Sequence, residues 1–286
     1  MVLALPHTRP PHAVLIEPVV GEALAEDLGR AGDLTTDCIV ASDAHASARL
    51  VARKPGTISG LIAAECAFRL IDASLRFRCE RPDGSSVGAG DVIAMIDGPA
   101  RAILTGERVA LNFAGHLSGI ATATRALVDA VAGTKARIVC TRKTTPGLRM
   151  LEKYAVRCGG GFNHRFGLDD AILIKDNHIA VAGGIEPAVE RVRAGTAHMV
   201  KLEVEVDTLD QLEEALALGV DTLLLDNMSL DDLRRAVALA NGRAVLEASG
   251  GVTLTTVRGI AETGVDYISS GAITHSAPAL DMALDF

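Results

Sequence analysis

The sequence predicts an α/β protein with a parallel barrel in its C-terminal part and a smaller α/β domain before it. From about residue 135 onward, short β-branched or aliphatic runs alternate with amphipathic segments. This order is typical of parallel strands joined by crossover helices. The first hundred residues lack that rhythm. An open doubly wound sheet would show the same alternation, and of the two we favour the barrel.

The N-terminal part has the pattern of a small α/β domain. We expect strands at 46–53 and 91–97, a helix near 61–72 and a turn-rich stretch at 81–90. Residues 106–132 then form a long, largely apolar helical pattern that we expect to join the two parts. Its side chains Arg108, Asn112 and His116 share one helix face, because they are four residues apart.

The C-terminal part contains six predicted strands with helices between them. The strands are expected at 137–140, 171–174, 200–206, 221–225, 244–246 and 265–268. The helix at 208–218 begins with a threonine cap and ends at Gly219, which is typical of a helix C-terminus. A second helix at 229–240 begins in the same way from a serine.

The composition excludes several classes of protein. The chain has 286 residues, which is enough for two domains. Its net charge of −8, with no tryptophan and two tyrosines, opposes nucleic-acid binding. Five cysteines without a C-x-x-C pair indicate neither a zinc knuckle nor a disulfide framework, and favour a reducing, cytoplasmic setting. Prolines interrupt the first twenty residues, so we expect neither secretion nor a membrane span.

One segment opposes the overall acidic balance. Residues 137–178 hold eight lysines and arginines against four carboxylates. Because aromatic residues for base stacking are scarce, this segment is better suited to small anions than to nucleic acid. A solvated basic helix face is the alternative reading of such a charge run.

Polar groups follow each predicted strand, where a parallel barrel gathers its catalytic side chains. These groups are Thr141, Arg142 and Lys143; Lys175, Asp176, Asn177 and His178; Glu203 and Glu205; Asp226 and Asn227; Ser249, Gly250 and Gly251; and Ser270 and Gly271. They divide into an early cationic half, which also includes His164 and Arg165, and a later half of carboxylates and small-residue loops. The site should therefore hold two different anions.

Each half has its own chemistry. Arginine binds planar carboxylates through paired hydrogen bonds and lysine supplies a point charge, so the cationic half could bind a dicarboxylate. Glu205 and Asp226 could bind Mg²⁺ directly or through water. Free backbone amides at 249–251 and 270–271 could hold phosphate.

Several residues have a structural alternative. Glu203 and Glu205 share one strand face, which leaves one of them open to a structural role. Asn177 and His178 could simply close a turn. We interpret His116 and Cys140 as packing residues, the commoner fate of such side chains in apolar surroundings. Cys158 precedes three glycines and could suggest a nucleophile, but no base follows at a set spacing.

Several segments of the sequence resemble those of a known family. TRKTTPGLRMLEKYAVRCGGGFNHRFGLDDAILIKDNHI at 141–179 is similar to the signature of quinolinate phosphoribosyltransferases. The resemblance continues through GDLTTD at 32–37, LNFAGHLSGIATATR at 111–125, EVEVDT at 203–208, LLLDNMS at 223–229, LEASGG at 246–251 and GVDYISSGAITHS at 264–276. Cys158 stands where a threonine is common in the family, and Phe162 and Phe166 vary the flanks of Asn-His-Arg. Neither departure removes a charged group.

The resemblance implies a fold and an activity. It implies a sandwich-like α/β domain at 1–117, an irregular α/β barrel at 118–275 and a tail at 276–286 that returns towards the first domain. The reaction would transfer phosphoribosyl from phosphoribosyl pyrophosphate to quinolinate with decarboxylation, giving nicotinate mononucleotide, pyrophosphate and carbon dioxide in de novo NAD biosynthesis. It would need Mg²⁺ and no organic cofactor. The protein would work as a homodimer or an assembly of dimers.

The resemblance also implies roles for residues. Arg142, His164, Arg165 and Lys175 would hold the quinolinate carboxylates, with Thr141 beside them, and Lys143 would contact phosphoribosyl pyrophosphate. Glu205 and Asp226 would position the ribose hydroxyls and Mg²⁺, and the loops Ser249, Gly250, Gly251 and Ser270, Gly271 would hold the 5′-phosphate. Arg108 would enter the neighbouring subunit's site. Lys143, Lys175, Glu205 and Asp226 are the residues we expect to be catalytic.

Three other functions are alternatives for this sequence. Molybdenum-transport-associated relatives share much of this scaffold, but the intact KDNH at 175–178 and NHR at 163–165 favour the biosynthetic enzyme. A nicotinate phosphoribosyltransferase handles one carboxylate, which needs fewer than five clustered cations. A non-catalytic anion-binding protein would need the cationic half without Glu205 and Asp226.

Overall fold

The computed structural model describes residues 9–286. Its described residues form two compact units. The first unit consists of residues 9–125, 144–160 and 272–286, and the second, the barrel unit, of residues 126–143 and 161–271. These bounds differ from the expected 1–117 and 118–275, because α5 (Arg149–Cys158) packs within the first unit. There Tyr154 and Cys158 form a buried cluster with Ala121.

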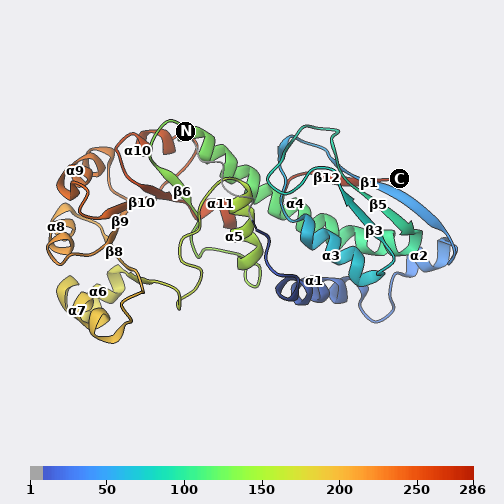
Figure 1. The fold of residues 1–286 in the computed structure, drawn as a ribbon, viewed down its shortest axis with the longest axis horizontal. Helices are drawn as coiled ribbons and strands as arrows, with labels where there is room; N and C mark the ends of the chain where they lie inside the picture. Colours follow the sequence, from blue (N-terminus) through green and yellow to red (C-terminus); the bar gives the residue numbers. More distant parts are fainter. Residues whose placement is uncertain (1–8) are drawn as a thin grey trace. The chain divides into compact units, whose positions relative to one another are not determined.

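The first unit contains a four-stranded antiparallel sheet (Figure 1). Its strands, in sheet order, are β12 (Met282–Asp285), β1 (His45–Ala52), β5 (Val92–Pro99) and β3 (Arg76–Cys79). The C-terminal strand β12 thus pairs with β1, with Arg49 opposite Asp285. A second, two-stranded sheet pairs β2 (Gly56–Thr57) with β4 (Ser86–Val87). Of these two strands, only β4 lies inside the turn-rich stretch expected at 81–90. The predicted strands at 46–53 and 91–97 are confirmed.

Helices pack against one another and on this sheet. They are α1 (Ala13–Leu28), α2 (Leu34–Ile39), α3 (Leu61–Ile71), α5, α11 (Ala272–His275) and the N-terminal part of α4 (Ala100–Ala130). The ring of Phe68 on α3 lies 6.3 Å from that of Phe77 on β3. Gly106 lets α4 approach α3, because an added Cβ would meet the Phe68 ring at 2.9 Å. The long helix predicted at 106–132 is confirmed, but it begins six residues earlier.

Two carboxylates, Asp83 and Glu152, join α5 to its surroundings. Asp83 accepts hydrogen bonds from the Gly60 and Leu61 amides at the start of α3 and from the Tyr154 hydroxyl on α5. Burial raises the pKa of Asp83, and these three donors oppose that rise. The same carboxylate therefore caps one helix and anchors another.

Glu152 is the second of these carboxylates, and it is fully buried. It accepts a hydrogen bond from His116 Nε2 at 2.8 Å and another from the Thr145 amide at 3.1 Å. The interpretation of His116 as a packing residue is therefore wrong: it is partly exposed and bonds to a buried charge. Cys140, by contrast, is fully buried as expected.

The ionisation of Glu152 should make the stability of the fold depend on pH. Burial alone would raise the pKa of Glu152, but the bonds from His116 and Thr145 outweigh it, and the pKa lies below its ordinary value of 4.5. A depressed pKa stabilises the fold above the unfolded value, and this contribution is lost as pH falls through the folded value. Glu152→Ala should cost about 2 kcal/mol at neutral pH, because His116 Nε2 and the Thr145 amide lose their buried acceptor.

The measurement is thermal unfolding from pH 7 to pH 3. The difference in Tm between the wild type and Glu152→Gln should stay constant above about pH 5 and shrink below the ordinary carboxyl pKa. Glu26→Gln, an exposed change on α1, is the matched control and should show no such trend. A Tm difference that does not vary with pH would contradict the assignment.

Six parallel strands form the barrel unit. They are β6 (Arg137–Val139), β7 (Ile172–Ile174), β8 (Leu202–Val206), β9 (Thr222–Asp226), β10 (Val245–Ser249) and β11 (Tyr267–Ser269). Their sheet order is β6-β11-β10-β9-β8-β7, so the first strand of the unit pairs with the last, as in a barrel. Within the described residues, β6 and β7 are not paired with each other. An isolated bridge joins Val139 of β6 to Phe162, which lies in the segment leading to β7. The irregular barrel and its six strands are confirmed.

Helices connect these strands. They are α6 (Asp176–Ala182), α7 (Ile185–Gly195), α8 (Leu209–Ala217), α9 (Leu230–Ala240) and α10 (Val257–Ala261). In Figure 1, α8, α9 and α10 lie outside β8, β9 and β10. The predicted caps are present: Thr208 Oγ1 accepts from the Gln211 amide, and Ser229 Oγ accepts from the Asp232 amide. One strand differs from expectation, since β10 extends to Ser249 and places Glu247 inside the strand.

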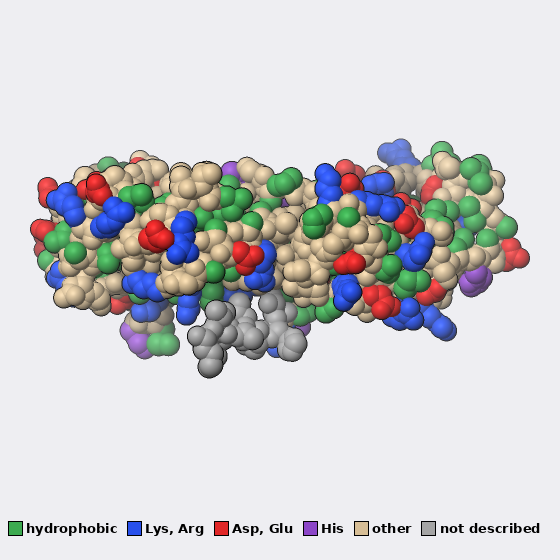
Figure 2. Space-filling view, turned by 90° about the horizontal axis from the view of Figure 1, so that it is seen from above, with side chains coloured by type: hydrophobic (Ala, Val, Ile, Leu, Met, Phe, Trp, Pro, Cys, Tyr) green, Lys and Arg blue, Asp and Glu red, His purple; other side chains and the backbone are tan. Residues whose placement is uncertain are grey.

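The charged surface is mixed. On the face drawn in Figure 2, acidic and basic side chains are interspersed. This agrees with the overall acidic balance of the sequence. Among residues 9–286, no helix combines the length and apolar character needed to cross a membrane.

Candidate active site

Two guanidinium groups lie close together near the carboxyl end of β6. Arg142 comes three residues after the strand, and Arg165 lies in the segment that leads to β7; both are partly buried. Burial and the positive charge of Arg142 both lower the pKa of Arg165, and Asp170 and Glu203 oppose this. Like charges gathered in a partly buried place favour an anion with more than one negative charge.

The residues around this pair hold it in place. Arg165 Nη1 donates to the carbonyl oxygen of Ala171 at 3.1 Å. Thr141 Oγ1 accepts from the Lys143 amide at 3.0 Å, which shapes the turn that carries Arg142. The Lys143 side chain itself is exposed.

The carboxylates follow on the neighbouring strands. Glu205, on β8, has a side chain that is 12% exposed, and it accepts a hydrogen bond from Lys175 Nζ at 3.1 Å. Asp226 ends β9, and its Oδ2 accepts from Asn227 Nδ2 at 2.7 Å. Because β8 and β9 are adjacent parallel strands, both carboxylates lie at the same end of the sheet. This set of oxygen donors fits Mg²⁺, which prefers carboxylates and water.

The first small-residue loop packs tightly on Asn227, the residue after Asp226. The Asn227 amide donates to the Ser249 carbonyl at 2.9 Å. Gly250 has φ +94°, and an added Cβ would overlap the side chain of Asn227. Gly251 is exposed, with φ +60°. Glycine at 250 is thus required both by the backbone conformation and by close approach.

Gly250→Ala should therefore disturb Asp226 through Asn227. The added methyl group pushes away the amide that bonds to Asp226 Oδ2, and the left-handed backbone is strained as well. For the substrates that the resemblance implies, we expect KM for phosphoribosyl pyrophosphate to rise about ten-fold, while KM for quinolinate changes little. Steady-state kinetics with each substrate varied in turn measures this.

Gly242→Ala is the control for that experiment, because Gly242 has φ +76° but no atom within 4 Å of an added Cβ. It carries the same backbone strain without the contact. Equal effects of the two substitutions on KM would remove Gly250 from the site.

The second loop differs from the expectation of free amides. The Ser270 amide donates to the Val139 carbonyl at 3.1 Å, and Ser270 is 4% exposed. Closing the sheet between β11 and β6 uses this donor, so the expectation is wrong for the Ser270 amide. What Ser270 can still offer a ligand is its hydroxyl group, next to Gly271.

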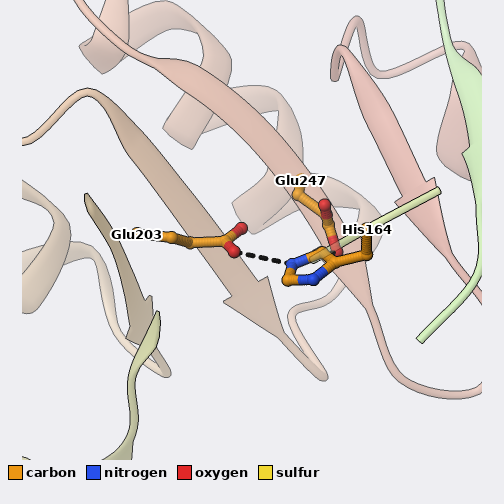
Figure 3. A group of neighbouring side chains, drawn as sticks. All are labelled: His164, Glu203 and Glu247. Atoms are coloured by element: carbon orange, nitrogen blue, oxygen red, sulfur yellow. Dashed lines mark hydrogen bonds and ion pairs between the residues drawn. The ribbon is translucent and has the colours of Figure 1, made fainter. Parts of the chain in front are cut away.

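His164 bonds to a carboxylate inside the barrel. Its Nε2 lies 2.7 Å from Glu203 Oε2 and 3.8 Å from Glu247 Oε1 (Figure 3). Glu203 and Glu247 are buried on β8 and β10. Sequence reasoning left Glu203 undecided and did not select Glu247. A lone glutamate within an apolar buried strand, as in AVLEAS, is the signal that could have found it.

Other candidates have structural explanations. His178 Nδ1 accepts from the Lys175 amide at the start of α6, so it closes a turn, as the alternative reading allowed. Cys158 is buried, and burial together with Asp83 raises the pKa of its thiol to about 11. Such a thiol is protonated at neutral pH and is not a nucleophile. Arg108 is exposed on α4 and belongs to the first unit.

The predicted site residues other than Arg108 thus all belong to the barrel unit. Those from Thr141 to Gly271 follow or end its strands or lie in the segment between β6 and β7.

Comparison with known proteins gives a consistent result. The family model described as quinolinate phosphoribosyl transferase, N-terminal domain, matches residues 33–118, and that of the C-terminal domain matches residues 120–285. A probable nicotinate-nucleotide pyrophosphorylase [carboxylating] of Bacillus subtilis is 46% identical over 91% of this chain and 89% of its own. The Mycobacterium leprae enzyme of that name is 44% identical over 93% of this chain and 95% of its own.

Solved structures agree in fold. The nicotinate-nucleotide pyrophosphorylase from Francisella tularensis superposes with a TM-score of 0.93 at 40% identity, covering 98% of this chain and 99% of its own. Since two family models together span most of the sequence and close relatives match nearly its full length, the chain belongs to the quinolinate phosphoribosyltransferase family.

Proposed function

We propose that this protein transfers phosphoribosyl from phosphoribosyl pyrophosphate to quinolinate with decarboxylation, in de novo NAD biosynthesis. The observation that carries the proposal is the pairing of two partly buried guanidinium groups, Arg142 and Arg165, in the same barrel unit as the carboxylates Glu205 and Asp226. One half suits a dicarboxylate and the other a metal-bound phosphate ester. Family membership supports the same reaction.

The cationic half would bind and orient quinolinate. Arg142 and Arg165 offer planar donors that match carboxylates, and the mutual repulsion of their charges is relieved when a dianion binds between them. Lys175, at the end of β7, adds a point charge next to Glu205. Clamped carboxylates fix the pyridine nitrogen, so part of the rate comes from positioning.

The carboxylate half would hold the second substrate. Glu205 and Asp226 would bind the ribose hydroxyls and Mg²⁺, directly or through water. When bound there, Mg²⁺ supplies positive charge that neutralises the pyrophosphate of the donor substrate. Gly250, Gly251, Gly271 and the hydroxyl groups of Ser249 and Ser270 would contact the 5′-phosphate.

The chemistry then proceeds in two steps. The pyridine nitrogen attacks C1 of the ribose as the bond from C1 to pyrophosphate breaks, and Lys143 stabilises the leaving group. The quaternised ring accepts the electron pair of the bond to the C2 carboxylate, which leaves as carbon dioxide, and C2 then takes up a proton. Lys175 would stabilise the developing negative charge. No organic cofactor is required by these steps.

We further propose a homodimer or assembly of dimers, in which the exposed Arg108 reaches the neighbouring site. A monomer would then be incomplete. None of the five cysteines, all of which lie within residues 9–286, forms a disulfide, which suits the reducing cytoplasm as the location of the enzyme.

The test is an assay for nicotinate mononucleotide and carbon dioxide from quinolinate, phosphoribosyl pyrophosphate and Mg²⁺. Nicotinate is the parallel substrate. Product from quinolinate alone supports the proposal, whereas product from nicotinate alone would indicate the non-decarboxylating transferase. No product from either, with folded dimeric protein, would favour a transport-associated or binding role.

A further inference from the structure

His164 uses both nitrogens of its ring. The Arg165 amide donates to Nδ1 at 2.8 Å, and Nε2 lies 2.7 Å from Glu203 Oε2. Turning the ring over would replace both nitrogens by carbons and lose both contacts, so the ring orientation is fixed by its surroundings.

These contacts determine where the proton lies. Because Nδ1 accepts a hydrogen bond from a peptide N–H, it carries no proton. Nε2 therefore carries the proton and donates it to Glu203, which makes His164 a neutral imidazole. A neutral ring with both nitrogens engaged has no charge and no free donor to give to a substrate carboxylate.

A bound metal ion is the other way to explain the cluster of His164, Glu203 and Glu247, whose ligand atoms lie within 4.8 Å of one another. A histidine that binds a metal through one nitrogen donates the N–H of the other. Here the other nitrogen accepts, so a metal at Nε2 would require the imidazolate form. The hydrogen bonds thus favour a proton rather than a metal between His164 and Glu203.

We propose that Glu203 is a positioning residue, which holds His164 as the neutral Nε2–H tautomer so that His164 Nδ1 fixes the backbone of Arg165. This rests on the proposed function, since Arg165 is the group that would bind quinolinate. The His164 contact and the Ala171 carbonyl hold Arg165 at two points, at its amide and at its guanidinium. Glu203 is 7% exposed, and its other oxygen, Oε1, is buried without a hydrogen-bond partner.

Charged groups from three parts of the barrel unit lie around the ring or in its segment. Glu203 and Glu247 face Nε2 from β8 and β10, and Arg165 and Asp170 belong to the same segment as His164. His164 would therefore affect quinolinate through Arg165, which revises the direct contact that the resemblance implied. Arg142, Arg165 and Lys175 would then make the direct contacts with the carboxylates of quinolinate.

The first experiment measures the tautomer without any turnover. Imidazole 1H–15N correlation spectra of the wild-type protein at neutral pH should show His164 with a protonated Nε2 and an unprotonated Nδ1. The His164→Gln variant, which lacks the signal, assigns it. A doubly protonated ring, or a proton on Nδ1, overturns the proposal whether or not the enzyme turns over quinolinate.

The second experiment compares two substitutions of Glu203. Glu203→Gln keeps an oxygen that accepts from Nε2–H, and KM for quinolinate should stay within about three-fold of the wild type. Glu203→Leu removes the acceptor, and KM for quinolinate should rise about ten-fold, the effect of one lost buried hydrogen bond. KM for phosphoribosyl pyrophosphate should not change in either. Glu213→Leu, an exposed change on α8, is the control.

The outcomes separate this proposal from the proposed function. Equal rises in KM for Gln and Leu would overturn the positioning role, and so would a parallel rise in KM for the other substrate. If the wild type shows no turnover of quinolinate, the proposed function fails, and the spectra still decide the tautomer. If Glu203→Leu does not fold, the Gln variant and the spectra remain decisive.

Discussion

Replacing Glu205 with alanine should abolish turnover while leaving quinolinate binding in place. Glu205 is 12% exposed at the end of β8, and in the proposed site it contacts the ribose and Mg²⁺. Arg142 and Arg165, which would hold quinolinate, come from a different part of the chain and keep their contacts. Loss of a group that stabilises developing charge should lower kcat by about a hundred-fold or more.

The measurement combines quinolinate titration by calorimetry with steady-state kinetics. Lys175 loses its partner in this variant, so Glu205→Gln, which retains an oxygen for Lys175 Nζ, separates that effect from loss of the carboxylate. The Gln variant should be nearly as inactive as the Ala variant. Glu213→Ala on α8 should behave as the wild type. Unchanged turnover in Glu205→Ala would remove its catalytic role.

The strands of the barrel unit could be predicted because each is a short apolar run that alternates with a capped amphipathic helix. Their ends shifted by a few residues where packing rather than pattern sets the limit, as at β10, which includes Glu247 and Ser249. Helix α1 gave no clear sequence signal, since Pro18 lies inside it. Its stability comes instead from tertiary packing, with Ile16 and Val20 fully buried.

The site was predictable to the extent that chemistry follows strand ends. Period-two alternation placed Glu203 and Glu205 on one face, and the structure places both there, one buried at His164 and one at Lys175. The local sequence pattern could not identify bonding partners that are remote in the sequence. The bond from the Ser270 amide to Val139 and that from His116 to Glu152 depend on closing the barrel and packing α5.

Arg165→Gln should raise KM for quinolinate about a hundred-fold, since a charge-assisted guanidinium–carboxylate contact contributes about 3 kcal/mol. KM for phosphoribosyl pyrophosphate should change little. Glutamine retains a hydrogen-bond donor, so the variant tests the charge and the paired geometry rather than bulk. Its partner change, Arg142→Gln, should have a similar effect.

The double variant decides whether the two guanidinium groups act on one anion. Burial and the positive charge of Arg142 lower the pKa of Arg165, as is expected where two like charges lie near each other. If one dianion relieves the repulsion between these charges, the two substitutions should be coupled, and their combined effect should differ from the product of the single effects. Initial rates with each substrate varied, and Arg191→Gln on α7 as an exposed control, measure this. Independent, multiplicative effects would instead place the two arginines on separate ligands, and the dicarboxylate clamp would have to be abandoned.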